Sequence, residues 1–409
     1  MSKKKQASSK KEEALSSIKT GFGQFLLDNK IIEDIGENSN VLPTGIDLLD
    51  SILGGGFSMN FVQVVGHSGG GKSTLVSKII ANGQEIWGED FISVYCDSEQ
   101  SMSERRLKSL GAKLPVQLIN DVTIEKVFKI IENLVVYKEM NKKYIDIPSI
   151  IVLDSLANTP SEKQTITEDH SETLGATKAK IWANYLPTAI LKLKKYNICL
   201  MCVNQYRQKI DMNPYAKAEK PLKFMNQNYN IPGGNSVYYN SYQLIEVKQK
   251  KEIETYGFPA INTEIKLIKN KNFTPNIIID VVCNYSKGFL NFWTNFEMLK
   301  KYKYISATKT CSLKSCPQPT FYTKNAIKTY LENEEWREAF DKDVEDCIKV
   351  NFIDKYDDMS SNILDINRNG ELQDLRDNSD DPIINMDETE DEIDKELNEL
   401  FEGEDSDNV

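Results

Sequence analysis

A glycine-rich segment between two apolar stretches has the residue types and spacing of a phosphate-binding loop. Residues 66–73 read GHSGGGKS, a full GxxxxGK(S/T) match that directly follows the apolar run FVQVV. Glycines let backbone N–H groups surround phosphate oxygens, while the lysine reaches the terminal phosphates and the hydroxyl ligates Mg²⁺. An ordinary glycine-rich turn is the alternative. The motif predicts an ATP and Mg²⁺ site formed by Gly66, His67, Ser68, Gly69, Gly70, Gly71, Lys72, Ser73 and Thr74.

Two further apolar runs end in the carboxylates that this chemistry needs. Asp154 follows SIIVL, and we predict that it holds Mg²⁺ together with Ser73. Asp97 and Glu99 follow FISVYC, and either could orient the attacking water and accept its proton. Taken alone, an Asp after a strand and a Glu at a helix start are common features. Beside a phosphate-binding loop, they predict nucleotide hydrolysis.

The elements that must position these side chains alternate along the chain. Short apolar runs at 61–65, 91–96, 149–153 and 197–203 are separated by helix-length segments. This alternation predicts an α/β fold with a mostly parallel central sheet, whose carboxyl-end loops carry the chemistry. After about residue 236 the pattern changes to hairpin-like strands, which predicts an antiparallel extension of the same sheet.

The formal charge of −11 on 409 residues is unevenly spread. Residues 371–409 hold 17 acidic and two basic side chains, a net charge of −15, which leaves +4 on residues 1–370. The acidic total therefore does not exclude a polyanionic partner. The longest apolar runs are too short to span a bilayer, so we expect no membrane association and an intracellular protein of the cytoplasm or nucleoid. Seven irregularly spaced cysteines favour a reducing compartment, and Cys199 and Cys202 lie in an apolar run as expected for buried thiols.

Residues 42–293 resemble the RecA/UvsX family of strand-exchange recombinases. The resemblance depends on several motifs in the family's order: LPTGIDLLDSILGGGFSMN at 42–60, DSEQSMSERRLKSLGA at 97–112, IVLDSLANTPSE at 151–162, CVNQYRQKI at 202–210, IPGGNSVYYNS at 231–241 and IKLIKNKNFTP at 265–275. It implies a RecA-type P-loop ATPase core that forms a filament on single-stranded DNA, pairs it with homologous double-stranded DNA, and hydrolyses ATP faster when DNA is bound. The length, the DSE sequence and the acidic end favour the phage UvsX branch.

The resemblance also assigns roles around the nucleotide. Glu99 would be the catalytic base, and Gln205 would sense the γ-phosphate. Lys269 and Lys271 would reach ATP on a neighbouring subunit, although from the residues alone they could form a solvated strand face. Arg106 stands where the family has an aromatic side chain on the adenine, and its planar guanidinium could stack there instead.

Two long segments, about 159–175 and 206–235, correspond to the family's DNA loops. The alternative is a pair of surface loops with ordinary lysines. The first loop is acidic, which favours wedging over attraction, and Lys178 on the following helix is a better candidate for a phosphate contact. The predicted DNA-binding residues are Arg207, Lys209, Gly233, Gly234, Asn235 and Lys178.

The chain divides into four expected parts. These are a basic leader with an oligomerisation helix or arm (1–40), the ATPase and DNA-binding core (41–299), a small helical C-terminal region (300–356) and an acidic, disordered tail (357–409). The tail could mimic DNA or recruit basic accessory or loader proteins, or it could merely aid solubility. Two other functions share the motifs: a hexameric replicative DNA helicase, and a RecA-fold phosphotransferase or regulatory ATPase that does not act on DNA.

Overall fold

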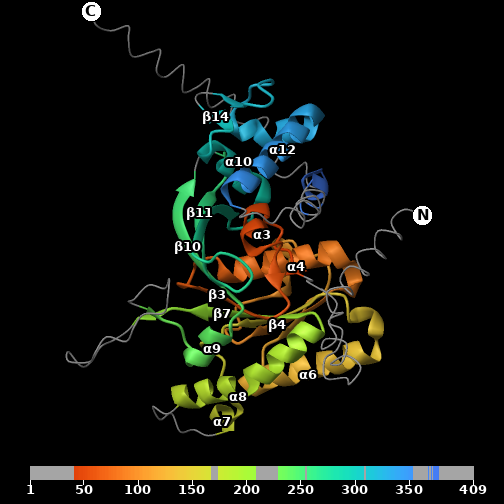
Figure 1. Ribbon diagram of the computed structural model, residues 1–409, viewed down its shortest axis with the longest axis vertical. Coiled ribbons are helices and arrows are strands. Elements are labelled where there is room, and N and C mark those ends of the chain that lie inside the picture. Colours follow the sequence, from red (N-terminus) through yellow and green to blue (C-terminus); the bar gives the residue numbers. More distant parts are fainter. Residues whose placement is uncertain are drawn as a thin grey trace, which may run out of the picture. The chain divides into compact units, whose positions relative to one another are not determined.

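A mixed sheet of nine strands forms the centre of the computed structural model, which describes residues 41–166, 174–208, 229–253, 256–307, 310–352, 367, 370 and 372–376 (Figure 1). The basic leader and most of the acidic tail lie outside these residues. From one edge to the other, the strands are β13 (Gly288–Phe289), β12 (Ile277–Asn284), β11 (Ala260–Asn270), β10 (Gln243–Ile253), β3 (Phe61–Gly66), β7 (Ile198–Gln205), β6 (Ser149–Asp154), β4 (Ile92–Asp97) and β5 (Gln117–Ile119).

Strands β10, β3, β7, β6, β4 and β5 form the parallel half of the sheet, as the sequence predicts. Its middle strands are buried on both faces because helices cover each side. Helix α4 (Lys72–Trp87) packs on one face, and α6 (Ile124–Met140) and α8 (Leu174–Lys195) pack on the other (Figure 1). This sandwich brings the carboxyl ends of β3, β4, β6 and β7 to one edge, where Asp97 pairs with Asp154 and Gly66 with Gln205.

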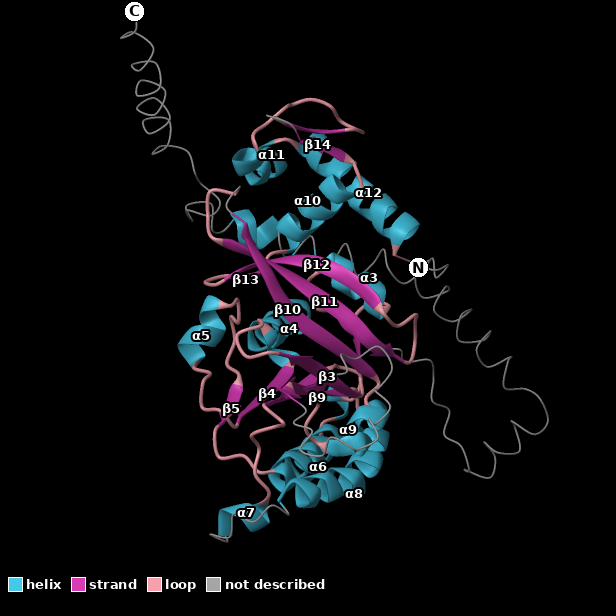
Figure 2. Ribbon diagram, turned by 90° about the vertical axis from the view of Figure 1, so that its left-hand side faces the viewer, coloured by secondary structure: helices cyan, strands magenta, loops and turns pink. Residues whose placement is uncertain are grey.

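The expected antiparallel extension is confirmed in strands β10 to β13, which run from the parallel half toward the C-terminal helices (Figure 2). The helices beyond them are α10 (Asn291–Lys301), α11 (Ala326–Glu332) and α12 (Glu334–Asn351), with a small hairpin of β14 (Ile305–Ala307) and β15 (Cys311–Leu313). Their aromatic side chains Phe292, Phe296, Tyr330, Trp336 and Phe340 belong to the same apolar cluster as α4. The boundary expected at 299/300 falls inside α10.

Shorter elements connect these parts. They are β1 (Val41–Leu42), α3 (Asp47–Leu53), β2 (Phe57–Ser58), the 3-10 turns η1 (Gly88–Asp90), η2 (Lys142–Tyr144) and η3 (Thr323–Asn325), α5 (Glu104–Ser109), α7 (Glu162–Ile166), β8 (Arg207–Gln208), β9 (Tyr229–Asn230) and α9 (Gly234–Asn240). Within the described part of the chain, none of the helices is long and apolar enough to cross a lipid bilayer.

Within the acidic tail expected from residue 357 onward, the described residues 367, 370 and 372–376 lie against the core. We call Asn367, Gly370 and Leu372–Arg376 the strap. Asn367 is buried, and its amide donates to carboxylates of α3, to Asp47 Oδ1 over 3.1 Å and to Asp50 Oδ2 over 2.9 Å. The average composition of the tail does not predict this contact. A few specific hydrogen bonds are sufficient to dock a short segment, and they do not change the average charge.

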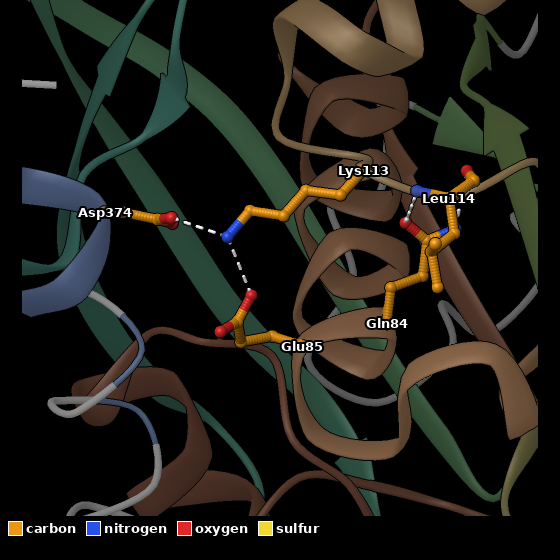
Figure 3. Close-up of polar contacts among 5 residues, drawn as sticks. All are labelled: Gln84, Glu85, Lys113, Leu114 and Asp374. Carbon is orange, nitrogen blue, oxygen red and sulfur yellow. Dashed lines mark hydrogen bonds and ion pairs between the residues drawn. The ribbon is translucent and has the colours of Figure 1, made fainter. Parts of the chain in front are cut away.

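An ion-pair network joins the strap to the helix after the phosphate-binding loop. Lys113 Nζ lies 2.8 Å from Asp374 Oδ1 of the strap and 2.9 Å from Glu85 Oε2 of α4 (Figure 3). Beside it, the Gln84 side chain bonds both backbone polar groups of Leu114, which fixes the chain after α5 against α4 (Figure 3). The strap is thus hydrogen-bonded to α3 directly and joined to α4 through Lys113.

Candidate nucleotide and nucleic-acid site

The loop between β3 and α4 has a backbone that only glycine fits at Gly66, and it leaves little room for a side chain at Gly70. A Cβ on Gly66 would lie 2.2 Å from the Val247 carbonyl oxygen of β10, and one on Gly70 would lie 3.0 Å from the same oxygen. Helix α4 begins after Gly71, whose φ is 90°, and no side chain caps its first amides. These open N–H groups and the positive end of the helix dipole suit phosphate oxygens.

The lysine of the loop is held at this helix start. Lys72 is almost fully buried, and its Nζ donates to the His67 carbonyl oxygen over 2.6 Å. Burial lowers the pKa of Lys72, and the carboxylates of Asp154 and Glu99 oppose that shift. The Lys72 ammonium, with two carboxylates nearby and the open N–H groups of α4 at its base, is placed where a triphosphate would meet it.

Asp154 and Ser73 meet at the same point, as the metal prediction requires. Ser73 Oγ donates to Asp154 Oδ2 over 2.5 Å, and the buried Tyr95 hydroxyl donates to the same oxygen over 2.7 Å. Burial raises the pKa of Asp154, and the two hydrogen bonds oppose the rise. A hydroxyl and a carboxylate beside a phosphate loop are the hard oxygen donors that Mg²⁺ prefers, so the residues present fit MgATP.

The structure distinguishes between the two carboxylates that follow β4. Asp97 is fully buried, and its oxygens accept from the backbone N–H groups of Glu99 over 3.1 Å and Met102 over 2.7 Å. Asp97 therefore shapes the turn and has no face toward a substrate. Glu99 is exposed at the same edge of the sheet, which makes it the carboxylate available for proton transfer.

Side chains from the ends of two neighbouring strands converge on Glu99. Its Oε1 accepts from Ser155 Oγ over 2.6 Å, from Asn158 Nδ2 over 2.9 Å and from Gln205 Nε2 over 2.7 Å. Gln205 ends β7, and the other two follow β6. Gln205 was predicted from the sequence to act at this edge, whereas Tyr95, Ser155 and Asn158 were not. Ser155 and Asn158 closely follow Asp154, which could have drawn attention to them, whereas Tyr95 is indistinguishable in sequence from a core aromatic.

Arg106 lies on α5, close enough to Cys283 of β12 for its charge to affect that thiol. Burial raises the pKa of Cys283 to about 12, and the guanidinium opposes the rise. The neighbouring turn lies over the start of α4, since a Cβ on Gly288 would be 3.4 Å from Thr74 Cγ2. Arg106 is thus on the β12 side of the loop, and its adenine contact stays a prediction.

Part of the predicted DNA site is brought together at the carboxyl end of β7. Burial and the nearby Arg207 charge lower the pKa of Lys178 on α8, so the two cations share one region. Gly233 and Gly234 have a packing role, because a Cβ on the first would meet Val237 at 2.8 Å and one on the second would meet Ala179 at 3.0 Å. Asn235 is exposed at the start of α9.

Much of both predicted DNA loops is outside the described residues, which omit 167–173 and 209–228 and therefore Lys209. The segments that begin and end each loop are described. Close like charges disfavour each other unless an anion is present, so Lys178 and Arg207 suit a phosphate.

Lys269 and Lys271 lie away from the phosphate loop of their own chain. Lys269 pairs with Leu244 of β10, which pairs with Gln63, three residues before Gly66 in β3. Its Nζ donates to the carbonyl oxygens of Tyr238 over 2.9 Å and Tyr239 over 2.8 Å. Burial and the neighbouring Lys271 lower the pKa of Lys269 to about 8. Lys271 is exposed just past the end of β11.

The cysteine expectation concerns packing. Cys199 and Cys202 are both buried in β7 but belong to apolar clusters on opposite faces of the sheet. Among the described residues, no group of three or more His, Cys, Asp or Glu side chains is placed to bind a metal.

Comparison with known proteins decides the family. A family model described as RecA N-terminal domain matches residues 9–290, well over half of the chain. The chain belongs to the RecA family. The RecA proteins of Francisella tularensis subsp. novicida (strain U112) and subsp. tularensis (strain WY96-3418) are each 27% identical over 286 residues, which is 68% of this chain and 72% of the relative. The fold is accordingly a RecA-type P-loop ATPase core, and the resemblance to RecA is confirmed. Membership indicates an ATP-dependent role in DNA recombination and repair.

Proposed function

We propose that this RecA-family protein assembles as a helical filament on single-stranded DNA and catalyses pairing and strand exchange with a homologous duplex, with DNA-stimulated hydrolysis of ATP to ADP and phosphate. The observation that carries the proposal is the convergence at one sheet edge. The phosphate loop, Asp154, Glu99 and Gln205 lie there, and Gln205 is separated by a single residue from the basic segment that begins with Arg207.

Several residues of this chain would take part in ATP hydrolysis, each with a different role. The loop amides and Lys72 would bind the triphosphate, Ser73 and Asp154 would hold Mg²⁺, and Arg106 would stack on the adenine. When bound, MgATP supplies the phosphoanhydride bond that is broken. Glu99 would orient water and accept its proton, because it is exposed beside Lys72 while Asp97 is buried.

Gln205 would couple the nucleotide to DNA. Its amide donates to Glu99 and its backbone leads into the second DNA loop, so a γ-phosphate that attracts the amide would move that loop. Arg207, Lys209 and Lys178 would neutralise DNA phosphates. Gly233, Gly234 and Asn235, where the second DNA loop ends, would lie beside the DNA.

Lys269 and Lys271 would complete a neighbouring subunit's site. They lie toward the opposite end of β3 from the phosphate loop of their own chain, so a head-to-tail contact would be needed to bring them to ATP. The N-terminal segment 1–40 would form an oligomerisation arm of the core 41–299. The acidic tail would recruit basic accessory proteins or screen the DNA groove. We further propose an intracellular location in the nucleoid and the phage UvsX-like branch, supported by the length, the DSE sequence and the acidic end.

ATP hydrolysis with and without single-stranded DNA tests the proposal. We expect DNA to stimulate the wild-type rate, Lys72→Ala to lose nucleotide binding, and Glu99→Gln to bind nucleotide but lose turnover. Electron microscopy should show filaments on the DNA, whereas closed rings would indicate a helicase. A wild-type rate that does not respond to DNA would contradict the recombinase proposal and favour a phosphotransferase or regulatory ATPase.

A further inference from the structure

One oxygen of Glu99 accepts three hydrogen bonds, which hold the carboxylate in one orientation. Ser155, Asn158 and Gln205 all donate to Oε1, at distances of 2.6, 2.9 and 2.7 Å. A carboxylate oxygen offers about two lone pairs, so three donors to Oε1 fix the orientation of the carboxylate and with it the direction of the lone pairs on Oε2. A base must accept the proton of the attacking water through an available lone pair, in the right orientation. This arrangement restrains Glu99.

The three donors differ in what else they do. Ser155 is fully buried beside Asp154, and Gln205 already has a proposed role as the γ-phosphate sensor. Asn158 is exposed and lies in a hydrogen-bonded turn in which its backbone N–H donates to the Ser155 carbonyl oxygen over 3.1 Å. It immediately precedes the first predicted DNA loop, 159–175.

The residues after Asn158, at the start of the first loop, are hydrogen-bonded to α6. The Pro160 carbonyl oxygen accepts from Ile124 N, at the start of α6, over 2.9 Å. Beyond it, Glu162 N donates to Glu125 Oε2 over 2.9 Å as α7 begins. A shift of this anchored segment relative to β6 would therefore be taken up in the few residues between Pro160 and the end of β6, and Asn158 is among them.

We propose that Asn158 is a positioning residue that restrains Glu99 in the DNA-free protein, and that DNA in the first loop removes this restraint. The inference rests on the proposed function and extends it, because DNA would then reach the base from both loops: through Asn158 from the first and through Gln205 from the second. Basal turnover is low while both amides hold Glu99, and it rises when the loops reorganise.

Replacing the amide tests this directly. Asn158→Ala should raise kcat for ATP without DNA about fivefold, since one hydrogen bond to a carboxylate is lost. The rate with saturating single-stranded DNA and the KM for ATP should not change, so the stimulation ratio falls about fivefold. Asn141→Ala is the matched control, because Asn141 is also exposed but its amide donates to the Tyr137 carbonyl oxygen at the end of α6. The double variant Asn158→Ala/Glu99→Gln should be as inactive as Glu99→Gln, and turnover above that level would show that the extra rate does not need Glu99 and would overturn the restraint.

A second measurement needs no nucleotide or turnover. A double-mutant cycle of Asn158→Ala and Glu99→Ala can be measured by unfolding the nucleotide-free protein. The effects of the two substitutions on the unfolding equilibrium constant should be coupled by a factor of about five. An unchanged or lower basal rate in Asn158→Ala, or no coupling in the cycle, overturns the restraint. If the wild type is stimulated by DNA and Asn158→Ala behaves identically, only the inference fails. If the wild type is not stimulated at all, the proposed function fails and the inference falls with it.

Discussion

Asn367→Ala should measurably destabilise the protein, although Asn367 belongs to a tail whose composition predicts disorder. The amide of this single side chain bridges two buried carboxylates, Asp47 and Asp50. Replacing it with alanine removes both hydrogen bonds and leaves the two oxygens without that donor. The remaining strap contact, Asp374 with Lys113, is on the surface, where both side chains are about half exposed.

The size of the effect follows from this contrast. A hydrogen bond to a charged group contributes about 1.5 kcal/mol, so the loss of two should lower the free energy of unfolding by about 3 kcal/mol. An exposed ion pair contributes less than about 1 kcal/mol, so Asp374→Ala should cost far less. The strap can also undock without global unfolding. Its docking free energy therefore limits the cost of Asn367→Ala, and a truncation after residue 366 measures that limit.

Urea unfolding of the full chain at pH 8 and low salt measures these differences. We expect the stabilities to fall in the order wild type, Asp374→Ala, Asn367→Ala, with the truncated chain at or below Asn367→Ala. Added salt should reduce the cost of Asp374→Ala and leave that of Asn367→Ala unchanged. Equal stability of Asn367→Ala and the wild type, or a larger loss in Asp374→Ala, would refute the argument that the buried amide anchors the strap.

Three further predictions concern the core. Tyr95→Phe removes one hydrogen-bond donor from Asp154. We expect the Mg²⁺ concentration that gives half-maximal nucleotide binding to rise about tenfold, with binding in EDTA unchanged. An unchanged Mg²⁺ titration would contradict the positioning role of the hydroxyl. Burial raises the pKa of Asp50 to about 7, so the folded protein keeps a proton that the unfolded chain releases. Stability should therefore fall as the pH rises from about 4 to about 7, and Asp50→Asn should flatten this slope in unfolding measured across that range. A slope that survives the substitution must come from another group. Lys269→Ala/Lys271→Ala should lose turnover, and mixing it with Lys72→Ala should restore activity at about a quarter of the interfaces if the lysines act across subunits. No restoration in the mixture would place them in their own subunit's site.

The local motifs determined the chemistry of this protein before its fold was known. The glycine spacing that ends in Lys72 and Ser73 requires a loop that exposes backbone amides, and Asp154 at the end of an apolar run requires a carboxylate at a strand end. Both constraints act within a few residues of the chain, and the parallel sheet then brings the glycine loop and Asp154 to one edge. The residues between Val41 and Asn284 were therefore predictable as a nucleotide-binding α/β core.

The tertiary structure decided what depends on pairs far apart in sequence. Backbone N–H groups donate to the buried Asp97, which leaves Glu99 as the carboxylate available to a substrate. The donors to Glu99 are residues 56, 59 and 106 positions away in sequence. The strap joins Asn367 to Asp47 and Asp50 across more than 300 residues, where average composition carries no information. Sequence periodicity reports one face of one element, whereas burial and hydrogen bonding depend on which elements meet.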